Sequence, residues 1–440
     1  MTTTVWRSRL ASLSALLLLS AQHGVASVPC TGVDKAAFDQ ATEAVAHLGE
    51  PALGRRETRA ATLAREGVVL RTGGTWGPAD PAPPHVVKEG ERLVFELDGG
   101  GRYEPLPGEV LIFGTHNRFL IYSSQAHFEA NVGGRVLPLR LYAKDGTLFT
   151  HPEAVWDPMI HELTFPGKEP VTIMYGGVME PPTGGGAPDM AHNIRRRVGA
   201  FALKEGRWQF QGYVTGEPQS TSWIGHAYGH HVRVDANGKI TMHFEMVAEE
   251  RMIDGRLLPW KTALFEVEMA DAFTMKEKPR LIFDPAPQGG TAFPAAERRE
   301  RGTGLLVGYL AEGQRPHQLK DKGLVLNAFS VANFSDMSYG SGLLVGKEVG
   351  GKMEWHPLLE PNGDLRVITR DLQRRLDINW CGRLTFYETS GGQLRAMLHG
   401  IPNGRDVTAS WSSPEVHRDI LDVPVELIFD ARGDLVDVKL

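Results

Sequence analysis

Residues Gly302–Gly308 (GTGLLVG) return 38 residues later, almost unchanged, as Gly340–Gly346 (GSGLLVG). A looser echo, Leu384–Phe386, follows the second copy at a similar interval, and the apolar run Leu264–Val267 precedes the first copy at another. A period of about 40 residues in strand-rich sequence is the length of one four-stranded blade of a β-propeller. The repeat therefore predicts an all-β propeller, with a β-sandwich as the second choice.

The sequence around the repeat has the same β-rich texture from about residue 67 onward. Short runs of β-forming residues, such as Val110–Phe113 and Val171–Tyr175, alternate with Gly, Pro, Asn and Asp. An Asn-Gly pair at residues 237–238 and another at 362–363 lie between such runs, and this dipeptide supplies the positive φ angles that tight hairpins need. Roughly 370 residues at loop-rich blade lengths suggest five blades. We therefore expect residues 67–440 to form a five-bladed β-propeller.

The first residues have the three-part layout of a secretory signal peptide. Arg7 and Arg9 give a positive start, Leu10–Ala21 is apolar, and small residues follow at a cleavage site. The apolar run is about a dozen residues, shorter than the roughly 20 that span a membrane, and an uncleaved anchor is the second interpretation. We expect residues 1–27 to be removed and residues 28–66 to form a helical arm. The mature protein is then secreted or periplasmic, without a transmembrane segment.

Net charge limits the class of binding partner, and the cysteine content predicts one disulfide. The formal net charge is −6, which argues against nucleic acid because that ligand favours a basic face. We expect a monomer. The two cysteines, Cys30 and Cys381, lie far apart in the sequence. In an oxidising compartment two such cysteines are most simply partners, so we expect a disulfide that ties the N-terminal arm to a late blade.

Three segments resemble the five-bladed propeller glycosidases of the arabinanase, xylosidase and furanosidase group. They are Asp80-Pro81 before the strand-like run His85–Phe95, Trp156–Ile160 before Val171–Tyr175, and the Gly-His-rich Ile224–His231. In that group an Asp-Pro pair begins an innermost strand. The resemblance covers residues 75–400 in outline and implies glycoside hydrolysis, with Asp80 and Asp157 as the base or nucleophile and its helper. Asp-Pro also begins ordinary turns, which is the alternative for Asp80.

Glycoside cleavage normally needs a second carboxyl group, protonated, to help the leaving oxygen. In the resembled family this acid is a glutamate that precedes a later blade, and Glu297 and Glu300 lie in that kind of position. The family's Glu-Gly-Pro or Glu-Ala-Pro type of motif is absent here, and arginines flank both glutamates. Because arginines lower the pKa of a glutamate whereas a general acid needs it raised, an exposed salt-bridging loop is the alternative.

A dense group of side chains suited to a sugar lies between residues 223 and 231. They are an indole, a phenol and three imidazoles: Trp223, His226, Tyr228, His230 and His231. We expect this segment to enter an innermost strand and line a central pocket beside Trp156 and Asp157. His243 and Glu245 follow one strand later, on one face of it. The sequence leaves three roles open for these histidines and Glu245: a divalent-cation site near the central channel, ligand contact, and structural use.

These observations predict a secreted glycoside hydrolase-like protein that acts on extracellular oligo- or polysaccharides. The alternative is a non-catalytic propeller that binds glycan or protein partners through its loops. The sequence contains no Gly-x-Ser-x-Gly elbow, no phosphate-binding loop and no His-Glu-x-x-His motif. Apart from the cation considered above, it predicts no cofactor.

Overall fold

The computed structural model describes most of the strand-forming part of the chain. The described residues are 61–71, 84–113, 118–148, 155–179, 196–214, 223–235, 237–248, 251–253, 256–258, 261–283, 311–313, 316–333, 338–363, 365–376, 378–402 and 419–440. The chain divides into two compact units, residues 1–62 with 181–194, and residues 63–180 with 195–440.

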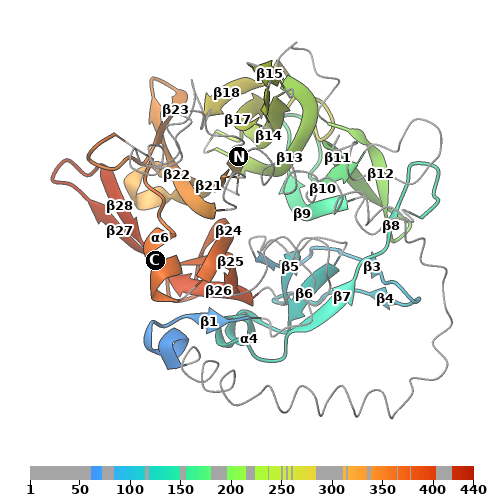
Figure 1. Ribbon diagram of the computed structural model, residues 1–440. Coiled ribbons are helices and arrows are strands. Elements are labelled where there is room, and N and C mark those ends of the chain that lie inside the picture. Colours follow the sequence, from blue (N-terminus) through green and yellow to red (C-terminus); the bar gives the residue numbers. More distant parts are fainter. Residues whose placement is uncertain are drawn as a thin grey trace, which may run out of the picture. The chain divides into compact units, whose positions relative to one another are not determined.

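Five sheets stand around a common centre in the second unit, so the fold is a five-bladed β-propeller, as the sequence predicts (Figure 1). Blade 1 contains β2 (His85–Val86), β5 (Val110–Phe113), β6 (Arg118–Tyr122) and β7 (Arg135–Pro138). Blade 2 contains β9 (Val155–Leu163), β10 (Val171–Met179), β11 (Arg196–Lys204) and β12 (Arg207–Tyr213), with β8 (Leu141–Tyr142) at its outer edge. Blade 3 contains β13 (Trp223–Val234), β14 (Ile240–Ala248), β17 (Lys261–Glu268) and β18 (Arg280–Phe283).

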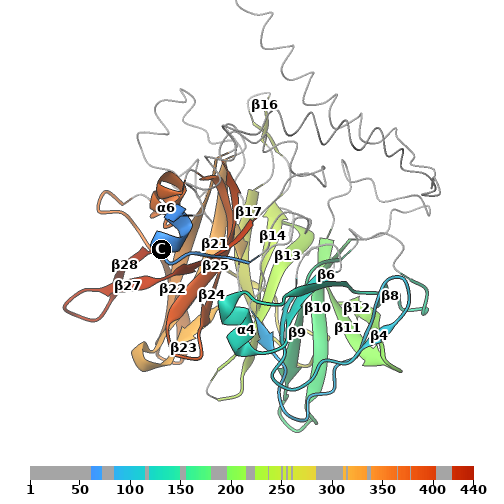
Figure 2. The same ribbon diagram turned by 90° about the horizontal axis from the view of Figure 1, so that it is seen from below.

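The last two blades follow the same meander. Blade 4 contains β21 (Leu324–Asn333), β22 (Ser338–Val349) and β23 (Lys352–Pro357), with β19 (Ala311–Gly313) and β20 (His317–Leu319) both paired to β21. Blade 5 contains β24 (Ile378–Glu388), β25 (Leu394–Pro402), β26 (Asp419–Pro424) and the early strand β1 (Val69–Leu70). Figure 2 shows the long strands of blades 4 and 5 side by side, with a further hairpin outside them.

Smaller elements connect or extend the blades. Hairpins are β3 (Phe95–Glu96) with β4 (Arg102–Tyr103), β15 (Arg251–Ile253) with β16 (Arg256–Leu258), and β27 (Glu426–Phe429) with β28 (Leu435–Lys439). Helices are α4 (Gln125–Ala130), α6 (Arg370–Arg375) and the 3-10 turn η1 (Lys320–Lys322). The helices in the described part of the chain are all too short or too polar to cross a membrane.

The ring closes through the pairing of β1 with β26, which joins residues near the start of the unit to residues near its end. Val69 pairs with Asp422 and Leu70 with Leu421. The helix that the sequence predicts before β1 is present at residues 61–65, and Gly67 ends it in the left-handed region at φ 67°. The rest of the predicted arm and Cys30 lie outside the described residues, as does the Cys381 side chain, so the disulfide stays a prediction.

Apolar clusters fill all five interfaces between neighbouring blades. Each cluster joins two adjacent blades through side chains such as Phe95 and Trp208 (blades 1 and 2), Tyr175 and Phe244 (2 and 3), Leu264 and Phe329 (3 and 4), Leu326 and Leu384 (4 and 5), and Ile112 and Met397 (5 and 1). A sheet that is covered on both faces buries both sets of its alternating side chains. The five clusters therefore hold the five blades together in a ring.

The repeat that predicts the propeller does not mark equivalent strands. Gly340–Gly346 lies in β22, the third strand of its blade, whereas Leu384–Phe386 lies in β24, the first strand of the next. Gly302–Gly308 lies outside the described residues. Local packing explains the glycine at position 346 of β22, because a Cβ there would lie 2.7 Å from the Trp355 ring. The fold prediction is confirmed, but a period of about 40 residues is not the blade length.

Candidate functional site

The first candidate region is formed by the N-terminal halves of two innermost strands. β9 and β13 each begin a blade, lie at the end of their sheet's strand order and contact one another. The segment Trp223–His231 therefore enters an innermost strand, as expected, and Trp156 and Asp157 are the second and third residues of the neighbouring one. Because innermost strands surround the central channel in a propeller, this topology brings the two segments towards one mouth.

Most of the predicted site side chains lie outside the described part of the structure. The backbone of six of them is described but their side chains are not: Trp156, Asp157, Trp223, His226, Tyr228 and His230. Asp80, Glu297 and Glu300 lie wholly outside the described residues. A carboxylate pair at the mouth and an aromatic-lined pocket beside Asp157 therefore stay predictions.

The other three predicted residues are described, and all three are buried. His231 and His243 are each 1 % exposed and Glu245 is 0 % exposed. His231 lies opposite His243 in the β13–β14 register, with 5.3 Å between their ring centres. Burial of this degree fits the structural role that the sequence analysis left open, and contact of these side chains with a ligand stays a prediction. Within the described part of the chain, no group of three His, Cys, Asp or Glu side chains could hold a metal ion.

The alternation of side chains along β14 explains where this polar cluster lies. Met242 and Phe244 belong to the apolar cluster that blade 3 shares with blade 2. His243 has the opposite orientation because successive strand residues point to opposite faces. The amide nitrogen of Asn327 on β21 donates to its Nδ1 at 3.4 Å, and the Trp355 ring on β23 meets its ring edge-on at 5.2 Å. His243 therefore lies in the interface between blades 3 and 4, which we call the 3–4 seam.

Glu266 connects the groups of the 3–4 seam. It lies opposite His243 in the β14–β17 register, and its Oε2 is 3.7 Å from His243 Nε2. The indole nitrogen of Trp355 donates to the same Oε2 at 3.0 Å, and Arg280 pairs with Oε1. Because Asn327 donates to Nδ1 of His243, the proton of the neutral imidazole belongs on Nε2, towards the carboxylate.

His243 is an uncharged base at neutral pH. Burial, which disfavours the charged form, lowers the pKa of His243 to about 4. Glu266 acts in the opposite direction, while Arg233 and Arg280 add to the lowering. The 3–4 seam thus holds a titratable group whose protonated form is disfavoured in the closed structure.

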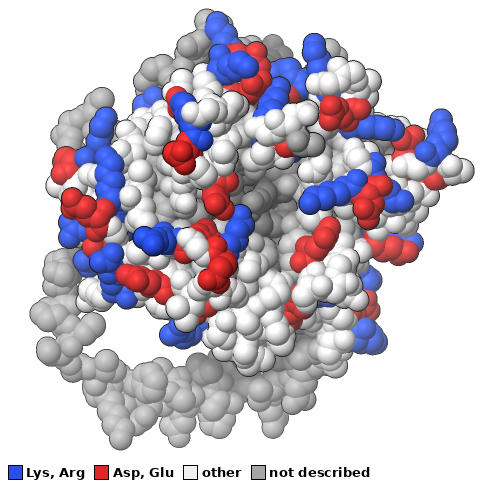
Figure 3. Space-filling model, turned by 180° about the vertical axis from the view of Figure 1, so that it is seen from behind, with Lys and Arg blue, Asp and Glu red and all other residues white. Residues whose placement is uncertain are grey.

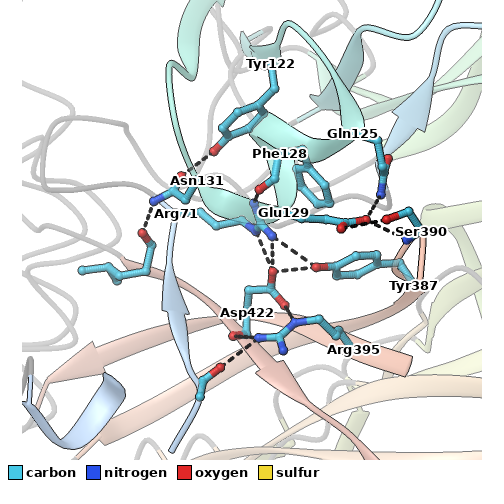
Figure 4. A network of polar contacts seen from close by, with 12 residues as sticks. Arg71, Tyr122, Gln125, Phe128, Glu129, Asn131, Tyr387, Ser390, Arg395 and Asp422 are labelled. Carbon is cyan, nitrogen blue, oxygen red and sulfur yellow. Dashed lines mark hydrogen bonds and ion pairs between the residues drawn. The ribbon is translucent and has the colours of Figure 1, made fainter. Parts of the chain in front are cut away.

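A second buried polar cluster, which sequence reasoning missed, lies where the ring closes (Figure 4). Arg71 Nε donates to Asp422 Oδ2 at 2.8 Å, and the hydroxyl of Tyr387 donates to the same oxygen at 2.6 Å. Arg395 Nε donates to Asp422 Oδ1 at 2.8 Å, and the Arg71 guanidinium lies 3.7 Å from the centre of the Phe128 ring. Burial lowers the pKa of Arg71, but Asp422 together with Tyr387 and Tyr122 outweighs burial, and the pKa of Arg71 is raised.

This second polar cluster, which we call the closure cluster, joins blades 5 and 1. Both carboxylate oxygens of Asp422 are bonded, and Asn131 adds a bond from its side chain to the carbonyl of Leu70 on β1. Buried charges are tolerated when they are paired and hydrogen-bonded. No local motif marks Arg71 or Asp422, because they are 351 residues apart and meet only when the ring closes.

Other surface features give weaker indications of a site. An open groove of about 670 Å³ separates the end of blade 4 from β28, and no residue of it was singled out from the sequence. It is lined by Pro357, Leu358, Leu359, Glu360, Pro361, Arg366, Leu435, Val436 and Asp437. Among the described residues on the face in Figure 3, basic and acidic side chains are interspersed.

Comparisons with known proteins give similarity only at the level of solved structures. No protein-family model matches the sequence, and no curated protein matches it. An endo-arabinase from Bacteroides thetaiotaomicron is 13% identical, with 80% of this chain and 96% of that chain covered and a TM-score of 0.46. An alpha-L-arabinanase from Cellvibrio cellulosa is also 13% identical, with 82% and 95% covered and a TM-score of 0.43. A thermostable family-43 glycoside hydrolase is 14% identical, with 84% and 96% covered and a TM-score of 0.48.

Proposed function

We propose that the chain is an exported glycoside hydrolase that acts on extracellular oligo- or polysaccharides. One observation carries the proposal: Trp156-Asp157 and the aromatic and histidine-rich segment Trp223–His231 belong to adjacent innermost strands of a five-bladed propeller. A carboxylate next to an indole is suited to a sugar, because the flat ring stacks on the pyranose or furanose face while the carboxylate acts at the anomeric carbon.

Apart from the buried His231, His243 and Glu245, each predicted residue has a definite role in this proposal. Asp157 is the base or nucleophile, Asp80 assists it, and Glu297 or Glu300 protonates the leaving oxygen. His226, Tyr228 and His230 bond the sugar hydroxyls, and Trp156 and Trp223 stack on the ring. Residues 1–27 are the cleaved signal, so the reaction takes place outside the cytoplasm.

Activity of the purified mature protein tests the proposal directly. The protein is incubated with a panel of nitrophenyl glycosides and polysaccharides, and released nitrophenol and reducing ends are measured. Asp157→Asn keeps the size of the side chain but removes its charge, so we expect the turnover of any active substrate to fall at least about 100-fold. Asp145→Asn is the matched control, because Asp145 sits in an exposed turn and asparagine can accept the same bond from Thr147. Equal activity of wild type and Asp157→Asn would remove Asp157 from the mechanism.

A non-catalytic glycan-binding propeller is the second candidate, and one observation favours it. Glu297 and Glu300 stand among Arg298, Arg299 and Arg301, which favour the ionised carboxylate over the protonated acid. Affinity electrophoresis in polysaccharide gels separates the two candidates. Retardation of the wild type with no product from any substrate supports the binding module, whereas product formation supports the hydrolase.

The Cys30–Cys381 disulfide is a separate part of the proposal. A bond between these residues would close a loop of about 350 residues, for which chain-entropy models give on the order of 5 kcal/mol. Mass spectrometry of a non-reduced digest of the exported protein should find the two peptides linked. Alkylation of both cysteines without prior reduction would contradict the bond.

A further inference from the structure

The 3–4 seam brings ionisable side chains of blade 3, several of them buried, against polar side chains of blade 4. The groups facing His243 are His231 and Arg233 from β13, Glu245 from its own strand, Glu266 from β17, Arg280 from β18, and the polar side chains of Asn327 from β21 and Trp355 from β23. Close packing holds His243 and Glu245 away from water, since neither exposes more than 1 % of its surface. Buried polar groups of this kind stay stable only while their charge states match their partners.

From this arrangement we propose that the 3–4 seam is an acid-sensitive opening of the propeller: protonation of His243 separates blades 3 and 4 while the other four interfaces stay closed. The inference is independent of the proposed hydrolase activity, because it uses only the seam's own contacts. The signal is a proton that binds His243, and the elements that separate are the sheets of blades 3 and 4.

The contacts of His243 explain why a proton opens the seam. A proton on Nδ1 faces the amide nitrogen of Asn327, which is itself a donor, so the present hydrogen bond is lost. The added charge on the buried ring is also repelled by Arg233 and by Arg280, although the Arg280 side chain is 56% exposed and is paired with Glu266. Glu266 compensates in part, but it is already engaged by Trp355 and Arg280. Opening relieves these costs because water then reaches the imidazolium.

The interface on the other side of blade 3, which we call the 2–3 seam, is mostly apolar where it is described but also contains one buried histidine, His161, whose ring centre lies 5.7 Å from that of Tyr175. Its cluster includes Tyr175, Val198, Met242 and Phe244, all buried and none of them titrating in weak acid. The two interfaces share strand β14, so they provide an internal comparison within one blade. Once His161 is replaced, acid should act on one face of β14 and spare the other.

Thiol labelling at one position in each seam tests the proposal. Leu344→Cys places a thiol in the apolar cluster of the 3–4 seam, and Val198→Cys places one in the 2–3 seam; both native side chains are fully buried. Labelling uses 4,4′-dithiodipyridine between pH 7 and pH 4, and each rate is divided by that of a free thiol peptide at the same pH. The rate of the unsubstituted protein is subtracted to remove the native cysteines.

We expect the corrected labelling rate of Leu344→Cys to rise on the order of 100-fold from pH 7 to pH 4, because the open seam binds the proton at an ordinary histidine pKa. The rate of Val198→Cys, measured together with His161→Gln so that the buried histidine of the 2–3 seam is absent, should change by less than about tenfold. Adding His243→Gln should abolish the rise, whereas His356→Gln, on the exposed face of β23, should preserve it. Leu264→Cys is the second reporter of the 3–4 seam if Leu344→Cys does not fold.

Two outcomes would overturn the proposal. Equal acceleration of the thiols in both seams would mean that acid unfolds the whole propeller rather than opening one interface. A full acid response that survives His243→Gln would mean that another group drives the opening. Activity of the protein enters neither readout, so failure of the hydrolase proposal leaves this test unchanged.

Discussion

Strand β14 presents opposite chemistry to its two neighbours. On one face Met242 and Phe244 pack with apolar side chains of blade 2. On the other, His243 contacts Asn327 of blade 4, and Glu245 is buried on the same face of the strand. The apolar face is stabilised by the removal of hydrocarbon from water, which does not depend on pH. The polar face depends on the charge state of its members. One face of β14 thus contributes apolar side chains to its interface, and the other face contributes ionisable ones.

Truncation on the apolar face should have the largest effect. Phe244→Ala removes a fully buried ring from the 2–3 seam, so we expect the free energy of unfolding to fall by about 3–5 kcal/mol. Urea denaturation at pH 7 and at pH 5 measures this loss, which should be the same at both. Val234→Ala is the control, since that side chain is 45% exposed and its truncation should cost little. A loss that is much larger at pH 5 than at pH 7 would contradict the expectation that the contribution of the apolar face does not depend on pH.

Removal of the titratable group on the polar face should have the next largest effect, and only in acid. The pKa of His243 is about 4 in the folded protein and about 6.5 when unfolded. Between these values the unfolded chain binds the extra proton, so stability falls as pH decreases from 6.5 to 4, by up to about 3 kcal/mol from this group. His243→Gln should flatten this part of the pH profile relative to wild type.

Urea denaturation at half-unit pH steps measures the two profiles. Their difference isolates His243, because the other groups contribute to both. His356→Gln is the control: because His356 is exposed, the pH profile of this variant should follow that of the wild type. Parallel slopes for wild type and His243→Gln would show that His243 is not responsible for the acid sensitivity of the seam.

Loss of a single bond across the 3–4 seam should have the smallest effect. Trp355→Phe keeps an aromatic ring beside His243 but removes the donor to Glu266, so we expect a loss of about 1.5 kcal/mol at pH 7. A double-mutant cycle with Glu266→Gln measures the coupling between the two side chains. Coupling within about 0.3 kcal/mol of zero would mean that this bond does not hold the blades together.

Local features of the fold could be predicted from the sequence because short-range chemistry determines them. The turn at Asp235 forms as expected: its Oδ1 accepts the backbone N–H groups of Asn237 and Lys239, and Gly238 has φ 77°. The strand runs Val110–Phe113 and Val171–Met179 likewise lie where β-forming residues gather. Chain length and strand content predict the five blades correctly, although the repeat that indicates a propeller does not mark equivalent strands.

The sequence by itself determined a strand-rich chain, its hairpin turns and the alternation that puts His243 and Glu245 on one face of a strand. Only the tertiary structure decided that this face is buried against Asn327 and Trp355, and that Arg71 meets Asp422. The physical reason is distance along the chain: strand periodicity acts over a few residues, whereas blade order brings together groups 84 and 351 residues apart. No local pattern encodes such a meeting, because it exists only once the ring of blades has closed.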